Sequence, residues 1–255
     1  MLELFAASLA SFVAAFVNSI AGGGGLVSVP ILFALFPDLP PAVLFGTNKA
    51  AMVWGTAWAA GTYARSVRLA VSTLAPAVVA ASAGGFLGAW LVTRVDGAVL
   101  RRFVPVMLTV TLAYTVWQRN FGDAHRPRFR QHQETIWATI TALALGVYDG
   151  FFGPGTGSFF IFAFVKLLGF DFLHAAAGAT LLNTATNAAS LCLFAWTGNV
   201  RWEFVVPMAA ANVIGSLLGT RVALKRGAPF IRVMFIVIVS ALILKTAADA
   251  YFRPA

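Results

Sequence analysis

Apolar residues fill most of the chain in runs that short polar gaps separate. The runs cover approximately residues 4–20, 25–36, 41–63, 69–93, 98–118, 135–151, 156–169, 172–197, 203–224 and 229–250. A membrane-spanning helix needs about 20 apolar residues, so most runs are long enough to cross a bilayer, whereas 25–36 and 156–169 are too short. Both short runs follow a cluster of glycines. The pattern predicts an all-α polytopic membrane protein that contains broken or re-entrant helices.

The composition agrees with a chain that lipid surrounds. Hydrophobic residues make up 60% of the 255 positions and charged residues only 11%, whereas a soluble domain carries about 25% charged residues. The net charge of +9 comes from basic residues in the short gaps, which is typical of loops that face anionic lipid and the cytoplasm. We therefore expect the lipid bilayer as a partner and no nucleic acid. A nucleotide loop, a catalytic dyad and a zinc motif are all missing from the sequence, so we expect no enzyme activity, metal or cofactor.

The second half of the chain resembles the first at a shift of 130 to 133 residues. The matched pairs are Asn18 with Asp149, Gly22 with Gly153, Gly24 with Gly155, Asp38 with Asp171, Thr47 with Thr180, Arg68 with Arg201, Pro76 with Pro207, Gly84 with Gly215, Gly88 with Gly219 and Arg102 with Arg232. Matches of rare residues in constant order indicate a duplication. The predicted organisation is a repeat over 1–118, a basic linker over 119–134 and a second repeat over 135–255.

The distribution of Lys and Arg indicates how the two repeats are oriented. Lys49 and Lys166 lie inside apolar elements, and 16 basic residues remain when they are set aside. If the halves are inverted, the loops 63–69, 119–132 and 220–232 share one side and hold 10 of these 16. If they are not, the split is 9 to 7. The positive-inside rule therefore favours two inverted-topology repeats with a cytoplasmic linker.

Each repeat carries a glycine cluster that can form an anion site. The first cluster is Gly22, Gly23, Gly24 and Gly25, preceded by Asn18; the second contains Gly153, Gly155, Thr156 and Gly157. Consecutive glycines destabilise a helix interior by up to about 1 kcal/mol each, so we expect the helix to break and restart at both places. A restarted helix directs its free N–H groups and positive dipole end at whatever precedes it. The alternative is that the glycines only allow close helix packing.

Two charged residues lie inside apolar runs, and each has two interpretations. Lys49 is deep in the 41–63 run, where it either contacts an anionic substrate or extends its amine to the membrane surface. Asp149 precedes the second glycine cluster and can couple transport to protons, cap the restarted helix or pair with a base. Because the first repeat has neutral Asn18 at the matched position, symmetry gives proton coupling no support.

Polar side chains gather near the predicted breaks. They lie on otherwise apolar runs; the residues are Thr47, Asn48, Thr180, Asn183 and Asn187. Asn183 and Asn187 are four residues apart and so share a face. Such groups either line a polar pathway or hydrogen-bond between helices, and as a set near the breaks they favour the pathway.

These motifs resemble those of the sulfite exporter TauE/SafE family of membrane permeases. The glycine cluster near the N-terminus, its echo after the midpoint, the sequence Gly46-Thr47-Asn48-Lys49 and the Thr180 region carry the resemblance, although Asn48 and Lys49 replace a smaller residue pair. The resemblance implies a multi-pass protein of the cell membrane, such as a bacterial inner membrane, that moves sulfite, sulfonates or organosulfur acids.

Together, the motifs predict a secondary transporter that moves a small anion by alternating access. An anion channel that uses the same helix N-termini is the alternative. The expected partner besides lipid is the small anionic substrate, and a homodimer is left open.

Overall fold

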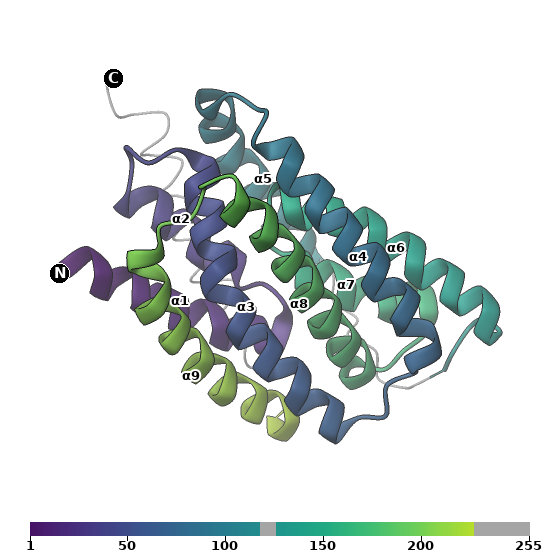
Figure 1. Cartoon of the computed structure of the whole chain (residues 1–255). Coiled ribbons are helices and arrows are strands. Elements are labelled where there is room, and N and C mark those ends of the chain that lie inside the picture. The colour runs from purple at the N-terminus through teal and green to yellow at the C-terminus, as the bar shows by residue number, and fades with distance from the viewer. Residues whose placement is uncertain (118–125, 227–255) are drawn as a thin grey trace.

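The structure is a computed structural model that describes residues 1–117 and 126–226, and these residues form a bundle of helices with short connections (Figure 1). The helices are α1 (Leu2–Ala21), α2 (Gly25–Leu35), α3 (Pro41–Ser66), α4 (Val71–Val92), α5 (Gly97–Trp117), α6 (Gln131–Phe151), α7 (Thr156–Ala163), α8 (Phe172–Trp196) and α9 (Trp202–Arg226). A π-helical turn, η1 (Phe164–Leu168), continues α7. The described chain contains no strand, which confirms the predicted all-α fold. The apolar run 229–250 and linker residues 118–125 lie outside the described residues.

Helix boundaries follow local chemistry that the sequence already shows. Pro41 occupies the first turn of α3, where its missing N–H has no helical partner to lose. The Asp171 carboxylate accepts a hydrogen bond from the backbone N–H of His174 at 2.9 Å and caps the start of α8. Gly22 ends α1 with φ of 75°, a left-handed conformation that favours glycine.

Three of the described helices are long and apolar enough to cross a membrane by length and composition. They are Leu2–Ala21, Val71–Val92 and the Trp202–Lys225 part of α9. Two apolar helices are shorter, Gly25–Leu35 and the continuous α7–η1 segment Thr156–Leu168. These two segments are the runs that the sequence marks as too short to span.

We name the two ends of the bundle after α3, which runs from the Pro41 end to the Ser66 end. At the Pro41 end, the Arg101 guanidinium donates to the Leu39 carbonyl at 2.5 Å, and the backbone N–H of Arg201 donates to Thr47 Oγ1 at 3.0 Å. These contacts bring the starts of α5 and α9 to the start of α3.

The Ser66 end collects the other connections. Thr73 donates to the Glu134 carboxylate at 2.8 Å, and the Arg126 N–H donates to the Gly169 carbonyl at 2.8 Å. The starts of α4 and α6 therefore lie together there with the end of η1. Because Ser216 of α9 donates to the Gly55 carbonyl of α3, α9 runs alongside α3 and also ends at the Ser66 end. The described parts of loops 63–69, 119–132 and 220–232 thus share one end of the molecule.

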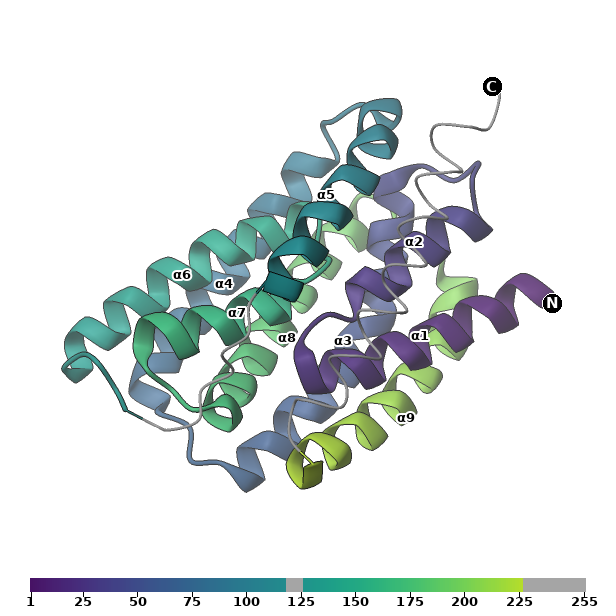
Figure 2. The ribbon, with the colours of Figure 1, turned by 180° about the vertical axis from the view of Figure 1, so that it is seen from behind.

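Two helical hairpins enter the bundle from opposite ends. The chain leaves α1, turns at the first glycine cluster and returns as α2 toward the Pro41 end (Figure 2). Gly24 lies against the Ala14 carbonyl and the Asn18 side chain, so α2 begins beside the last turns of α1. The α6–α7 hairpin starts and finishes at the Ser66 end, because Gly169 contacts Arg126. The predicted breaks are therefore confirmed in both halves.

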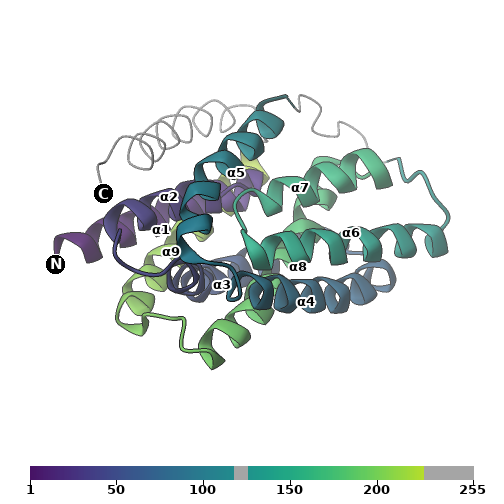
Figure 3. The same cartoon turned by 90° about the horizontal axis from the view of Figure 1, so that it is seen from above.

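In each half of the chain, one helix packs against a helix of the other half: α4 of the first half against α6, and α9 of the second half against α1. Figures 1 and 3 show α9 beside α1, and α4 beside α6. Gly215 and Gly219 of α9 lie on the backbone carbonyls of Phe12 and Phe16 of α1. In the same way, glycines of α4 lie on carbonyls of α6; the contacts are Gly84 on Leu143 and Gly88 on Val147. A shift of 131 residues converts one set of four residues into the other, so the repeat found in the sequence is also a repeat of contacts.

Candidate functional site

The two glycine breaks meet at the centre of the bundle. The Ser158 N–H donates to the Gly22 carbonyl at 3.1 Å, and the Ser158 hydroxyl donates to the Ala21 carbonyl at 2.5 Å. Gly22 and Gly157 touch backbone to backbone, and a Cβ on either residue would collide with the other. The contact closes the space directly between Gly22 and Gly157 in this conformation. Any substrate volume therefore lies beside the contact.

Side chains and carbonyls of the protein hold both breaks in shape. The Asn18 carboxamide oxygen accepts from the Gly24 N–H at 3.2 Å, and the Thr156 hydroxyl donates to the Gly153 carbonyl at 2.8 Å. Gly153 and Gly155 have φ of 93° and 83°, which L side chains rarely adopt. Asn18 and Thr156, predicted as substrate ligands, thus already contribute to the local fold of the breaks. Their role toward a substrate stays a prediction.

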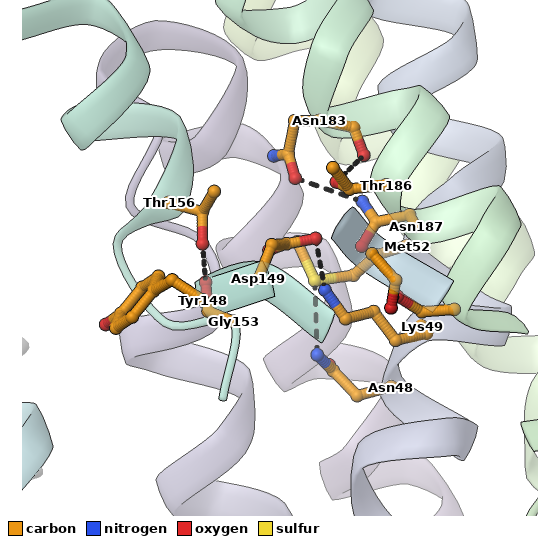
Figure 4. A network of polar contacts seen from close by, with 12 residues as sticks. Asn48, Lys49, Met52, Tyr148, Asp149, Gly153, Thr156, Asn183, Thr186 and Asn187 are labelled. Carbon is orange, nitrogen blue, oxygen red and sulfur yellow. Dashed lines mark hydrogen bonds and ion pairs between the residues drawn. The ribbon is translucent and has the colours of Figure 1, made fainter. Parts of the chain in front are cut away.

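A buried ion pair lies beside the second break. The Lys49 ammonium of α3 is 2.5 Å from Asp149 Oδ2 of α6, and the two side chains are 4% and 2% exposed. The Lys49 nitrogen also lies close to Gly153 (Figure 4). Lys49 therefore does not extend to the membrane surface, because its amine points into the centre of the bundle. Asp149 is thus paired with a base, while its role in proton coupling stays a prediction.

Amide side chains surround the ion pair in Figure 4. Asn187 donates to the Asn183 carboxamide oxygen at 3.3 Å, so these two neighbours on α8 face one another as their spacing predicts. Asn48 donates to the Met52 sulfur at 3.3 Å, while its own Oδ1 is buried without a hydrogen-bond partner among residues 1–117 and 126–226. A buried acceptor without a partner is costly. The Asn48 oxygen can therefore accept a hydrogen bond from a ligand that carries a donor.

The two threonines matched by the repeat lie outside this network. Thr47 donates to the Val43 carbonyl and accepts from the Arg201 N–H, so its hydroxyl joins α3 to the start of α9. Thr180 donates to the Ala176 carbonyl of its own helix. Both hydroxyls have structural partners in this conformation. The structure therefore brings Lys49, the second break and the α8 amides together, without these threonines.

Sequence reasoning missed several residues that shape the site. The Tyr148 hydroxyl donates to the Pro154 carbonyl at 2.7 Å and shares a 3.0 Å hydrogen bond with Thr111 of α5. Met52 receives hydrogen bonds from Asn48 and from Ser28 of α2. The sequence offered one signal for each residue. Tyr148 directly precedes Asp149, and Met52 lies one helical turn after Asn48, so both were close to residues already predicted for the site.

The repeat gives this site a neutral counterpart. The shift of 133 that takes Thr47 to Thr180 also takes Lys49 to Leu182, and Asp149 corresponds to Asn18. Leu182 and Asn18 are buried, at 0% and 6% exposure. The charge pair therefore occurs at one of the two sets of positions that the sequence repeat matches, and uncharged residues occupy the other.

Comparison with known proteins identifies the group to which the chain belongs. The profile of the family described as "Sulfite exporter TauE/SafE" matches residues 7–246. The chain belongs to the TauE/SafE family. Its relatives include "Probable membrane transporter protein ORF9" of Sinorhizobium sp, 36% identical over 94% of this chain and 91% of the relative. A "Probable membrane transporter protein" of Haemophilus influenzae is 33% identical over 89% of this chain and 87% of the relative.

A third relative also carries the name of a membrane transporter. "Probable membrane transporter protein YfcA" of Escherichia coli is 33% identical over 94% of this chain and 88% of the relative. No solved structure matches the chain. The family and the names of these relatives indicate a membrane transporter rather than an enzyme.

Proposed function

We propose that this TauE/SafE protein is a secondary transporter that moves a small anion across the cell membrane by alternating access. The observation that carries the proposal is the buried Lys49 ammonium beside the second helix break. A buried cation inside a membrane is costly and marks a functional site by default. The nearby start of α7 adds the positive end of a helix dipole, and its Thr156 and Ser158 N–H groups already bond to the Gly153 and Gly22 carbonyls.

The paired hairpins support two inverted repeats as the basis of alternating access. α1 starts at the Pro41 end and its repeat counterpart α6 starts at the Ser66 end, while the glycine contacts of each are equivalent. Inverted repeats with broken helices at the midplane are typical of secondary transporters, in which one group of helices rocks against the other. Because the Ser66 end carries the more basic loops, we place it and the linker in the cytoplasm.

The chemistry of the site favours a compact oxyanion as substrate. The Lys49 ammonium is a charged donor beside the positive end of the α7 dipole, and sulfite and sulfonates present several acceptor oxygens to such a donor. The description of the family as a sulfite exporter supports sulfite or an organosulfonate. The low exposure of Lys49 and Asp149 supports a carrier over a channel, because an open pore would expose them to water.

A thermal-shift screen tests the substrate class. The purified protein is heated with sulfite, sulfate, thiosulfate, taurine or sulfoacetate. A ligand present at 100 times its Kd stabilises the native state by about 2.7 kcal/mol, which for a chain of this size raises Tm by roughly 5–10 °C. A counterflow assay in proteoliposomes then separates the two mechanisms. Exchange of labelled for unlabelled anion supports a carrier, whereas flux at channel rates without counterflow contradicts the proposal.

A double variant tests whether Lys49 holds the anion. Lys49→Met combined with Asp149→Asn removes the positive charge without leaving a carboxylate unpaired. A charge-assisted hydrogen bond is worth about 1.5–3 kcal/mol, so affinity should fall about tenfold or more at 1.4 kcal/mol per decade. Asp149→Asn alone is the matched control, because it keeps Lys49. Equal affinities in the two variants would remove Lys49 from the substrate site.

A further inference from the structure

The electrical balance of the central site restricts what can enter it. Lys49 and Asp149 form a pair with no net charge, and their side chains are almost fully buried. Among the described helices that pack against α6 in this region, α4 and α7 carry no charged residue. A monoanion that enters to contact Lys49 would bring the buried site to a net charge of −1. Burying an uncompensated charge is strongly unfavourable.

Asp149 and an incoming anion also compete for the same donors. The Asp149 carboxylate already occupies the Lys49 ammonium at 2.5 Å, and an ammonium has three N–H donors in a compact head. A proton on Asp149 removes the competing charge and restores neutrality with the anion in place. The carboxylic acid can then serve as a hydrogen-bond donor, while Lys49 stays charged and pairs with the substrate.

We propose that Asp149 takes up one proton each time an anion binds Lys49, so that the protein is a symporter of one proton per anion. The proton comes from water on the side to which the site is open, binds a carboxylate oxygen of Asp149 and leaves to water on the other side with the anion. Lys49 keeps its proton throughout the cycle. The proposal rests on the transport function proposed above and names its coupling ion.

The surroundings of Asp149 single it out from the other titratable groups. On its own helix, Tyr148 donates to the Pro154 carbonyl. The neighbouring elements carry other titratable groups: Arg101, Arg102 and Tyr114 on α5, exposed Lys166 on η1, and His174 and the exposed Cys192 on α8, of which His174 contacts Asp171 at 2.7 Å. In the described part of the chain, only Lys49 forms an ion pair with Asp149.

Two comparisons within the chain support a single proton site. Glu134 is also buried, but it bonds to Thr73 and lines a cavity of about 370 Å³ at the Ser66 end, away from Lys49. The repeat counterpart of Asp149 is Asn18, whose amide does not take up a proton near neutral pH. The counterpart of Lys49 is Leu182, so the matched positions carry neither charge. Of the two matched positions 18 and 149, only Asp149 carries a carboxylate, which implies one proton per cycle.

Proton counting in proteoliposomes tests the inference. Sulfite, isethionate and sulfoacetate are the probes, and a pH-sensitive dye inside the vesicles records protons moved per labelled anion. We expect the wild-type protein to move one proton more per anion than Asp149→Asn, whichever probe is transported. The Glu134→Gln variant is the matched control and should keep the wild-type proton count.

Binding measurements give a second readout that does not depend on flux. When a group must gain a proton for a ligand to bind, affinity falls about tenfold for each pH unit above the range where that group is protonated. We expect this slope in the wild-type protein and a flat profile with Asp149→Asn, measured with isethionate and sulfoacetate because their sulfonates stay ionised. Asp149→Asn should also be stabilised more by the anion, since the anion neutralises its unpaired Lys49.

The outcomes separate failure of the coupling from failure of the transport function. Net uptake of anion by the wild-type protein without proton uptake overturns Asp149 coupling, while counterflow in the same vesicles leaves the transporter standing. Equal proton counts in wild type and Asp149→Asn also overturn the coupling. Absence of counterflow with all three probes contradicts the proposed function itself. If Asp149→Asn fails to fold, the wild-type proton count and its pH slope still decide the question.

Discussion

Breaking the Lys49–Asp149 pair from one side should destabilise the protein more than replacing both partners. Lys49→Leu leaves the Asp149 carboxylate at 2% exposure without its cation, and Asp149→Asn leaves the ammonium at 4% exposure without its anion. Removing one member of a buried ion pair costs about 3–5 kcal/mol, whereas replacing both by neutral residues is often neutral or stabilising. The structure therefore predicts strong coupling between the two substitutions.

The residues matched to Lys49 and Asp149 by the repeat supply a natural template for the double variant. Lys49→Leu with Asp149→Asn reproduces the residues at the equivalent positions, Leu182 and Asn18. A change of 1 kcal/mol shifts Tm by about 2–4 °C for a chain of this length. Each single variant should therefore melt roughly 6–20 °C below wild type, and the double variant within about 4 °C of it.

Thermal unfolding in detergent without substrate measures the three variants beside wild type. The chain contains seven tryptophans, so intrinsic fluorescence reports the transition. Lys166→Leu is the control for loss of a lysine from an apolar segment, because Lys166 is exposed and should shift Tm little. Single variants that melt with wild type, or a double variant that melts at the sum of the two losses, would refute the reasoning.

Two further predictions address the break and the topology. Gly22→Ala should lower Tm by several degrees, because φ of 75° is strained for alanine and the new Cβ meets Gly157, whereas Gly61→Ala in α3, with open space around it, should leave Tm unchanged or raise it; equal Tm values would contradict the close contact. In a background without the exposed Cys192, cysteine at Arg128 should react with a membrane-impermeant maleimide only after the cytoplasmic face is opened. Labelling in intact cells would reverse the assigned topology.

The glycine clusters made the helix breaks predictable because their effect is local. Glycine destabilises a helix interior whatever surrounds it, and Gly22 and Gly155 take the left-handed conformations that end or precede a helix. The starts of α3 and α8 also depend on local interactions, namely Pro41 in the first turn and the Asp171 cap. The repeat was visible because identical contacts, such as those of Gly84 and Gly215, need the same small residue in each half.

The partner of Lys49 could not be predicted from the sequence. Asp149 is 100 residues away, and only the packing of α3 against the second hairpin decides that the two meet. The same holds for Thr47, whose hydroxyl bonds to the start of α9 although its sequence context suggested the substrate pathway. A residue type fixes which hydrogen bonds are possible, and the tertiary fold selects the one that forms.

The exchange of α4 and α9 between the halves also determines when the protein can fold. Ser11 of α1 receives hydrogen bonds from the Asn212 amide across 201 residues of chain. Translation proceeds at about 5–20 residues per second, so the first helix waits roughly 10–40 seconds in the membrane before its partner is made. During this time the backbone of α1 around Phe16, against which Gly219 packs in the folded protein, lacks its contact with α9. The native packing of α1 therefore waits until α9 has been synthesised.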